Sequence, residues 1–108
     1  MIRMVLLYNL PDGADEAEFL KWRLGEHQQE NAGMPGVLTT DFSQITERWT
    51  LENKLASAPY RFMTTVEWPD RATFEQSFYA TTPEEWAESF KIMKDPIFLI
   101  SEVLVSTQ

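Results

Sequence analysis

The chain has 108 residues, 44% of them hydrophobic and 13% aromatic, which is typical of one globular domain that buries its own core. It contains no cysteine, so disulfides, thiolate catalysis and cysteine-ligated metal centres are excluded. The net charge is −8, and the nine basic residues are scattered along the chain. Because binding to phosphates requires clustered lysine and arginine, we expect no nucleic-acid or anionic-membrane partner.

The N-terminal apolar run, residues 1–7, is followed at once by Asn9, Pro11 and Asp12. This run is too short for the core of a signal peptide and far too short to span a membrane. We therefore expect a soluble, cytoplasmic protein.

The first half of the chain predicts a strand, a helix and a second strand. Residues 2–8 are rich in branched and aromatic side chains, which favours a strand. Asp15 can cap the helix that follows, with Glu18 completing a capping box, and the helix is expected to end near residues 31–33. Residues at helical spacing predict a buried face that includes the only histidine: Ala17, Leu20, Leu24 and His27. The second strand is expected from residue 37 to about residue 45.

The second half repeats this order. Residues 60–68 alternate between two faces, as expected of a strand. Two helices are predicted over about 71–80 and 83–93, the second with Thr82 as its cap and Pro83 at its first position. A last strand is expected over 97–105. Residues 46–59 fit a loop, a short helix or an extension of the hairpin equally well.

This order is that of the ferredoxin-like split βαβ fold, an α+β class in which helices cover one face of a four-stranded antiparallel sheet. The sequence predicts a single domain over residues 1–108. The first and last strands are apolar on both sides, and no residues remain to cover the second face of the sheet. A second copy of the sheet is the simplest cover, so we predict a homodimer formed through this face.

Two sequence segments resemble a known superfamily. Trp22 and His27, followed by Pro35-Gly36-Val37, resemble the dimeric α+β barrel superfamily, in particular its EthD-like and RedY/HapK-like members. The segment 66–70, followed by Phe74, resembles the corresponding part of the antibiotic-biosynthesis monooxygenase branch. Together these similarities imply the dimeric α+β barrel fold for this chain.

The resemblance also implies a range of functions. The superfamily includes polyketide cyclases, cofactor-free oxygenases, haem-degrading enzymes, isomerases and proteins without known activity. RedY-like members are associated with pathways to pyrrole- or indole-derived natural products, and their pockets lie between the sheet and the helices of one subunit. The chain resembles the haem-degrading branch at Asn9 and Trp68, but residues 78–91 contain no histidine to ligate haem. We therefore expect no cofactor.

His27 is the leading candidate for a catalytic residue, because imidazole alone titrates near neutral pH without being perturbed. As a neutral ring it can take a proton from an acidic carbon or hydroxyl and return it to a leaving oxygen. The alternative is a histidine that stabilises the end of its own helix. A metal site that combines His27 with Asp41 or Glu67 lacks ligand spacing, and we expect no metal.

Three further polar residues are candidates for substrate binding. Asp41 could orient the imidazole or face solvent. Arg61 could hold a carboxylate or phenolate of the ligand, or form an ion pair at the surface that contributes little stability. Tyr8 could donate its hydroxyl to a substrate carbonyl, or belong to the core with a solvated tip.

Several large aromatic side chains lie on the predicted helices and at strand ends. Their spacing is compatible with core packing, but apolar walls with few polar groups also describe a small-molecule pocket. The predicted pocket set is Trp22, Trp68, Phe78, Trp86 and Phe90. The sequence contains no glycine-rich phosphate loop, nucleotide fingerprint or serine-hydrolase elbow.

The leading hypothesis is a cofactor-free tailoring enzyme that cyclises, dehydrates or isomerises an aromatic natural-product intermediate by proton transfer. His27 would be the base and acid, and Tyr8 or Arg61 would polarise an oxygen. Two alternatives remain: a non-catalytic dimer that binds a hydrophobic intermediate, and a cofactor-independent monooxygenase. This functional class depends on analogy at the level of the fold.

Overall fold

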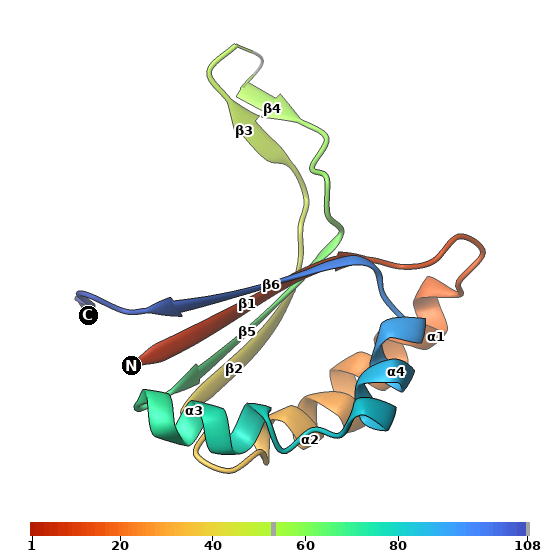
Figure 1. Cartoon of the computed structure of the whole chain (residues 1–108). Helices are drawn as coiled ribbons and strands as arrows, with labels where there is room; N and C mark the ends of the chain where they lie inside the picture. The colour runs from red at the N-terminus through yellow and green to blue at the C-terminus, as the bar shows by residue number, and fades with distance from the viewer. Residues whose placement is uncertain (53, 108) are drawn as a thin grey trace.

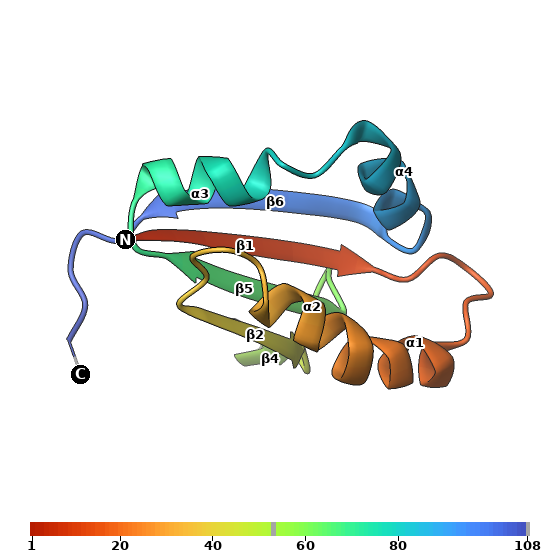
Figure 2. The ribbon, with the colours of Figure 1, turned by 90° about the horizontal axis from the view of Figure 1, so that it is seen from below.

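A four-stranded antiparallel sheet forms the centre of the computed structural model, which describes residues 1–52 and 54–107. The strand order is β2-β5-β1-β6 (Figure 1). The strands are β1 (Ile2–Asn9), β2 (Thr39–Gln44), β5 (Phe62–Trp68) and β6 (Lys94–Glu102). All the helices lie on one side of this sheet (Figures 1 and 2). This arrangement confirms the predicted ferredoxin-like α+β fold.

Each half contributes helices to the covered face. The first half supplies α1 (Glu16–Trp22), η1 (Arg23–His27) and α2 (Gln28–Ala32), and the second supplies α3 (Arg71–Phe78) and α4 (Pro83–Lys91). Side chains cap the helix starts at the expected positions: Asp15 accepts a hydrogen bond from the Glu18 amide, and Thr82 and Glu85 form a complete capping box. At Asp15 the structure has this bond alone, without the return bond from Glu18 that the predicted box requires. Within the described part of the chain, none of these helices is long and apolar enough to cross a membrane.

The first helix departs from the sequence prediction at its centre. It was expected to be continuous, but residues 23–27 form a π-helical turn between two α-helical segments. The wider turn rotates the residues that follow relative to the expected buried face. As a result, Leu24 is 63% exposed, whereas Arg23 is only 2% exposed. The predicted core position at Leu24 is therefore wrong, and Arg23 occupies the buried side of the helix.

Alternation along the strands separates two faces of the sheet. Side chains of β1 and β5 that point toward the helices form the core, and they include Met4, Tyr8, Phe62, Val66 and Trp68. Phe74 from α3 and Phe19 from α1 pack onto these strands. We call this side of the sheet the covered face.

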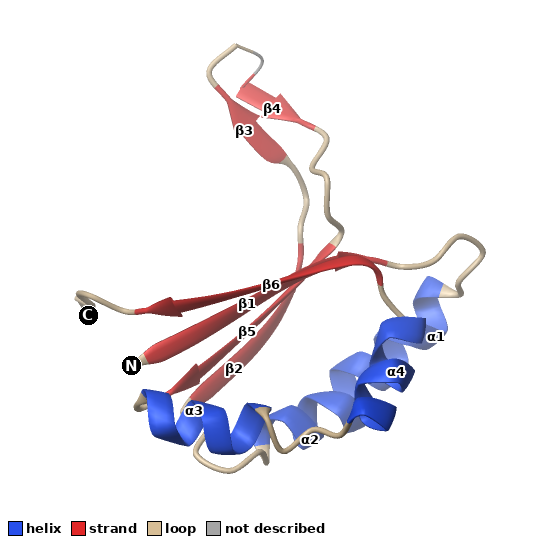
Figure 3. Cartoon of the chain, viewed as in Figure 1, coloured by secondary structure: helices blue, strands red, loops and turns tan. Residues whose placement is uncertain are grey.

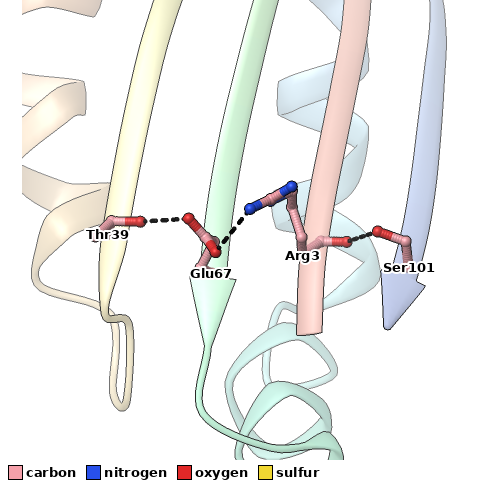
Figure 4. Close-up of polar contacts among 4 residues, drawn as sticks. All are labelled: Arg3, Thr39, Glu67 and Ser101. Atoms are coloured by element: carbon pink, nitrogen blue, oxygen red, sulfur yellow. Dashed lines mark hydrogen bonds and ion pairs between the residues drawn. The ribbon is translucent and has the colours of Figure 1, made fainter. Parts of the chain in front are cut away.

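The other side, here called the open face, carries the alternate residues of the same strands. At one end, Glu67 accepts hydrogen bonds from Arg3 and Thr39, while the Ser101 hydroxyl donates to the Arg3 carbonyl (Figure 4). Beyond this polar row, β1 and β6 present apolar side chains on the open face (Val5, Leu7, Ile97 and Leu99), with Met63 of β5 next to Leu7. The β2 side of the same face remains polar, with Asp41, Ser43 and Thr65.

Residues 46–52 and 54–59 form an arm that leaves the sheet. Strands β3 (Arg48–Thr50) and β4 (Lys54–Ala56) pair with each other and make a separate two-stranded sheet. Figures 1 and 3 show this hairpin projecting from the sheet on the side opposite the helices. The apolar side chains Trp49, Leu51 and Leu55 are exposed. Of the three readings left open for this segment, the hairpin is closest, although Asn53 lies outside the described residues.

The last strand is displaced from its predicted range of 97–105 and covers Lys94–Glu102. Because β6 pairs along β1, it ends where β1 has no residues left: Ile2 pairs with Glu102, and the Val103 amide bonds the Met1 carbonyl. Pro96 lies inside β6, where it is tolerated because β6 is an edge strand.

Candidate functional site

A cavity of about 460 Å³ lies between the covered face and the helices. Its walls are mainly apolar and aromatic, and they come from β1, β5, β6 and all five helical segments. The polar side chains in this lining include Tyr8, Arg23, His27, Thr64 and Ser77. An apolar hollow of this size with a few convergent polar groups is typical of a small-molecule site.

His27 lines the cavity from the end of the π-helical turn. Its ring stacks on Trp22, with centroids 4.3 Å apart and an interplanar angle of 22°. Nδ1 lies 3.4 Å from Glu30 Oε2, within ion-pair distance, but it is buried and makes no hydrogen bond of acceptable geometry. Glu30 also lines the cavity.

The environment of His27 favours its neutral form. Burial lowers the pKa of the ring, and the nearby Arg23 charge lowers it further, while Glu30 and Glu26 oppose these effects. The ring is therefore deprotonated at neutral pH. A neutral imidazole in an apolar cavity is able to accept a proton.

Arg23 is buried beside the histidine and was not singled out from the sequence. Its Nη1 donates to Gln28 Oε1 at 2.7 Å, and its Nη2 donates to Thr64 Oγ1 at 3.2 Å. The guanidinium carbon lies 4.2 Å from the centre of the Phe42 ring. These contacts attach the helix to β5 and β2.

Tyr8 and Thr64 stand next to Arg23 on the covered face. Burial raises the pKa of the Tyr8 hydroxyl, and interactions with Arg23 and Thr64 partly offset this rise. Tyr8 therefore remains protonated at neutral pH and retains a proton to donate. It is one of the predicted binding residues that line the cavity.

The predicted aromatic set divides between the cavity and its surroundings. Trp22, Trp68, Phe78 and Trp86 line the cavity, whereas Phe90 does not belong to the lining. Phe90 is 47% exposed and instead packs on Trp86 and Phe98, with ring centroids 6.1 Å away in each case.

Asp41 and Arg61 lie outside the cavity. Asp41 alternates with the inward-facing Thr40 and Phe42, so its side chain is exposed on the open face. The Arg61 guanidinium forms an exposed two-bonded ion pair with Glu16. The structure brings neither residue to the histidine.

The described residues contain no group of three histidine, cysteine, aspartate or glutamate side chains placed to hold a metal ion. The carboxylates considered as partners for His27 are on the wrong side of the sheet. Glu67 belongs to the polar row of the open face together with Arg3, as Figure 4 shows, and His27 lies against the covered face.

A signal for Arg23 was present in the sequence. Arg23 lies three residues after Leu20 and four before His27, so all three fit one helical stripe. A charged side chain in an otherwise apolar stripe is informative, because arginine is almost never fully buried without a partner. The π-helical turn itself had no comparable signal.

Several solved structures share this fold. HapK from Hahella chejuensis is 24% identical and matches all of this chain and 97% of its own, with a TM-score of 0.67. An EthD family protein from Bacillus halodurans is 17% identical over 96% of this chain and 99% of its own, with a TM-score of 0.65. SnoaB from Streptomyces nogalater, a cofactor-independent oxygenase, is 11% identical over 97% and 94%, with a TM-score of 0.61.

Another solved structure with this fold is described as dimeric. A protein from Thermobifida fusca, described as dimeric and ferredoxin-like, is 14% identical over 94% of this chain and 90% of its own, with a TM-score of 0.63. No curated protein matches the sequence. The sequence model of the family described as REDY-like protein HapK matches residues 2–104, and the chain therefore belongs to that family.

Proposed function

We propose that this protein is a cofactor-free tailoring enzyme that moves a proton on an aromatic natural-product intermediate, such as a pyrrole-, indole- or polyketide-derived compound. The reaction would be a cyclisation, a dehydration or an isomerisation. The observation that carries the proposal is the position of His27, held neutral in the wall of an aromatic-lined cavity. Membership of the HapK family and the fold of SnoaB support the broader class of tailoring proteins.

In the proposed mechanism, the neutral ring of His27 removes a proton from an acidic carbon or hydroxyl of the ligand. The protonated Tyr8 hydroxyl donates a hydrogen bond to the ligand oxygen on which charge develops. His27 then returns the proton to a carbon or to a leaving oxygen. Trp22 fixes the imidazole plane by stacking, and the apolar walls exclude water from the reacting atoms.

Proton removal can be tested without knowing the natural substrate. The probe is 5-nitrobenzisoxazole, a small aromatic compound whose ring opens when a base removes its carbon-bound proton, giving a coloured cyanophenolate. We expect the protein to accelerate this elimination and His27→Ala to lower the rate by about 10²- to 10⁴-fold, as for loss of a general base.

Leu24→Ala is the matched control, because this side chain lies on the same helical turn but is exposed. The control should retain the wild-type rate. Equal rates for His27→Ala and the wild-type protein, with both folded, would remove the basis for proton transfer by His27.

Cofactor-independent oxygenation is a second candidate, favoured by the fold shared with SnoaB. It would use the same base to form a carbanion that reacts with dioxygen. Oxygen consumption during turnover of an activated phenol would distinguish it from proton transfer alone. A non-catalytic carrier is the third candidate, and it predicts binding of aromatic compounds with no change on replacement of His27.

The proposal includes a homodimer in which two open faces pack together. The apolar open-face residues defined above would be covered by the same residues of the second copy, as a two-fold interface requires. The arm projects from this side of the sheet (Figures 1 and 3), so its exposed Trp49 and Leu55 would extend along the second copy. The Thermobifida fusca protein, described as dimeric, supports the dimeric state itself.

A further inference from the structure

Arg23 is a buried cation for which the proposed proton transfer provides no role. It is 2% exposed, yet it lines the cavity next to Tyr8, His27 and Thr64. Burial lowers the pKa of its guanidinium, but arginine remains charged inside proteins. A full positive charge therefore stands at the wall of an apolar cavity.

The partners of this charge among the described residues are neutral. The guanidinium meets the Gln28 amide, the hydroxyls of Thr64 and Tyr8, and the ring of Phe42. Across residues 1–52 and 54–107, carboxylates pair with other cations, among them Arg3, Arg61 and Arg71, but none lies within ion-pair distance of Arg23.

A buried charge without an opposite charge destabilises the folded protein when no ligand is bound. A buried charge is normally paired, because neutral dipoles replace only part of the hydration that the charge loses. Attaching the helix to the sheet does not require a charge, since neutral side chains could make the same bonds to Thr64 and Gln28. What the guanidinium adds is donors arranged to match an anionic oxygen group.

We propose that Arg23 is the anion-binding residue of this cavity and that the ligand is an aromatic compound carrying an anionic oxygen, either a carboxylate or a phenolate. The inference rests on the proposed function only in placing the ligand in this cavity. The aromatic walls would bind the ring, and Arg23, with the Tyr8 hydroxyl, would bind the oxygen. His27 would then stand beside the bound anion as a neutral base.

Other features of the wall agree with a polar ligand group. Trp68 Nε1, Ser77 Oγ and His27 Nδ1 are buried without hydrogen-bond partners, and all three residues line the cavity. Neither of the two lining carboxylates forms an ion pair with Arg23: Glu30 lies beside His27, and Glu85 caps α4 with Thr82. They therefore leave the Arg23 charge uncompensated.

The test compares two ligands of the same shape and different charge. Binding of 2-naphthoate and 2-naphthamide to the wild-type protein is measured by calorimetric titration. We expect the anion to bind at least about tenfold more tightly, because a charge-assisted hydrogen bond replaces a neutral one. In a second arm, 4-nitrophenol is titrated by absorbance, and binding as the phenolate should lower its apparent pKa.

Variants then assign the preference to Arg23. Arg23→Met should bind 2-naphthoate and 2-naphthamide equally, while Arg71→Met, which removes an exposed charge of the same kind on α3, should keep the wild-type ratio. If Arg23→Met does not fold, the affinities for 2-naphthoate and 2-naphthamide are compared on the wild-type protein and on Arg23→Lys, which retains the charge. Equal affinities for the two ligands on the wild-type protein would still count against an anion site.

Equal affinities for the naphthoate and the naphthamide, together with an unchanged apparent pKa of 4-nitrophenol, would overturn the inference. Tighter binding of naphthoate than of naphthamide identifies a site for carboxylates. Tighter binding of 4-nitrophenolate than of 4-nitrophenol identifies a site for phenolates. Because no turnover is measured, a protein that selects anions but does not open 5-nitrobenzisoxazole would retain this inference and lose the proposed proton transfer.

Discussion

The covered face and the open face of the sheet are made by the same strands, yet they have different properties. On the covered face, Phe62, Val66 and Trp68 are almost fully buried, and the remaining space is a defined cavity. On the open face, Ile97 and Leu99 remain exposed beside a row of hydrogen-bonded polar side chains.

This difference shows how alternation allows one sheet to serve two purposes. Side chains separated by one position along β5 point to opposite faces, so the residues that shape the cavity and those that face a second copy change independently. The cavity needs the helices of its own chain, whereas none of the described helices covers the open face.

Truncation of one large side chain on each face should have very different effects. Phe62 is fully buried against Tyr8, Phe19 and Phe42, so Phe62→Ala should lower the free energy of unfolding by about 3–5 kcal/mol. Leu99→Ala, on the open face, should cost less than about 1 kcal/mol when measured at protein concentrations low enough to disfavour association. Urea denaturation measures both, and equal losses would contradict the distinction between the faces.

A glycine on the covered side gives the next largest effect. Gly36 has a φ of +77°, and a Cβ at this position would overlap the Thr73 side chain of α3. Gly36→Ala should therefore cost about 3 kcal/mol, from backbone strain and overpacking together. Gly13 has a similar φ of +81° with open space around it, so Gly13→Ala should cost only about 1 kcal/mol. Comparable thermal denaturation of the two variants would mean that helix α3 does not constrain this turn.

A charge on the open face should affect assembly more than folding. We expect Leu99→Lys to weaken the proposed homodimer at least about tenfold, near 1.4 kcal/mol, because the two-fold axis places this unpaired charge in the interface twice. Sedimentation velocity over a concentration series measures the change. Leu104→Lys, also exposed but beyond the end of β6, is the control and should leave association unchanged.

The smallest expected effect is the pH dependence due to His27. Burial and Arg23 lower the pKa of His27 in the folded protein below that of the unfolded chain, which is about 6.5. At pH values between these two pKa values, the unfolded state therefore binds more protons than the folded state. The contribution of His27 to the free energy of unfolding should therefore be full above about pH 6.5. It should decrease as the pH falls toward the pKa of His27 in the folded protein.

His27→Gln should reduce this fall. Urea midpoints at about pH 7.5 and pH 5.5 for both proteins isolate the contribution of the imidazole, because the other titrating groups are shared. The opposite sign, with the wild-type protein gaining stability on acidification, would show that Glu30 outweighs burial and Arg23.

The sequence predicted those parts of the fold that depend on local patterns. The capped starts at Asp15 and Thr82, and the alternation along residues 60–68, are each encoded within a few residues. The ends of β6 were misplaced because they depend on pairing with β1, which is remote in sequence. The structure of the arm could not be predicted from the sequence, because its strands are only three residues long and pair with each other in a separate two-stranded sheet.

The candidate site was predictable to a similar extent. Tyr8, His27 and four of the five predicted aromatic residues do line one cavity. Arg23 was missed although it shares the helical stripe of Leu20 and His27, because a charged side chain was not expected on a buried face. Leu24 was misplaced because it lies in the π-helical turn, where the regular helical period does not hold. Arg61 was a reasonable choice among the basic residues, but its partner Glu16 is remote in sequence and became visible only in the structure.

The π-helical turn also affects how this chain should be aligned with its relatives. A turn with wider hydrogen-bonded rings contains about one residue more than an α-helical turn of equal rise. Alignment with a homologue whose helix is regular therefore requires a one-residue gap between Trp22 and Gln28. An ungapped alignment would place either Arg23 or His27 opposite a non-equivalent residue, and the two would falsely appear to vary independently.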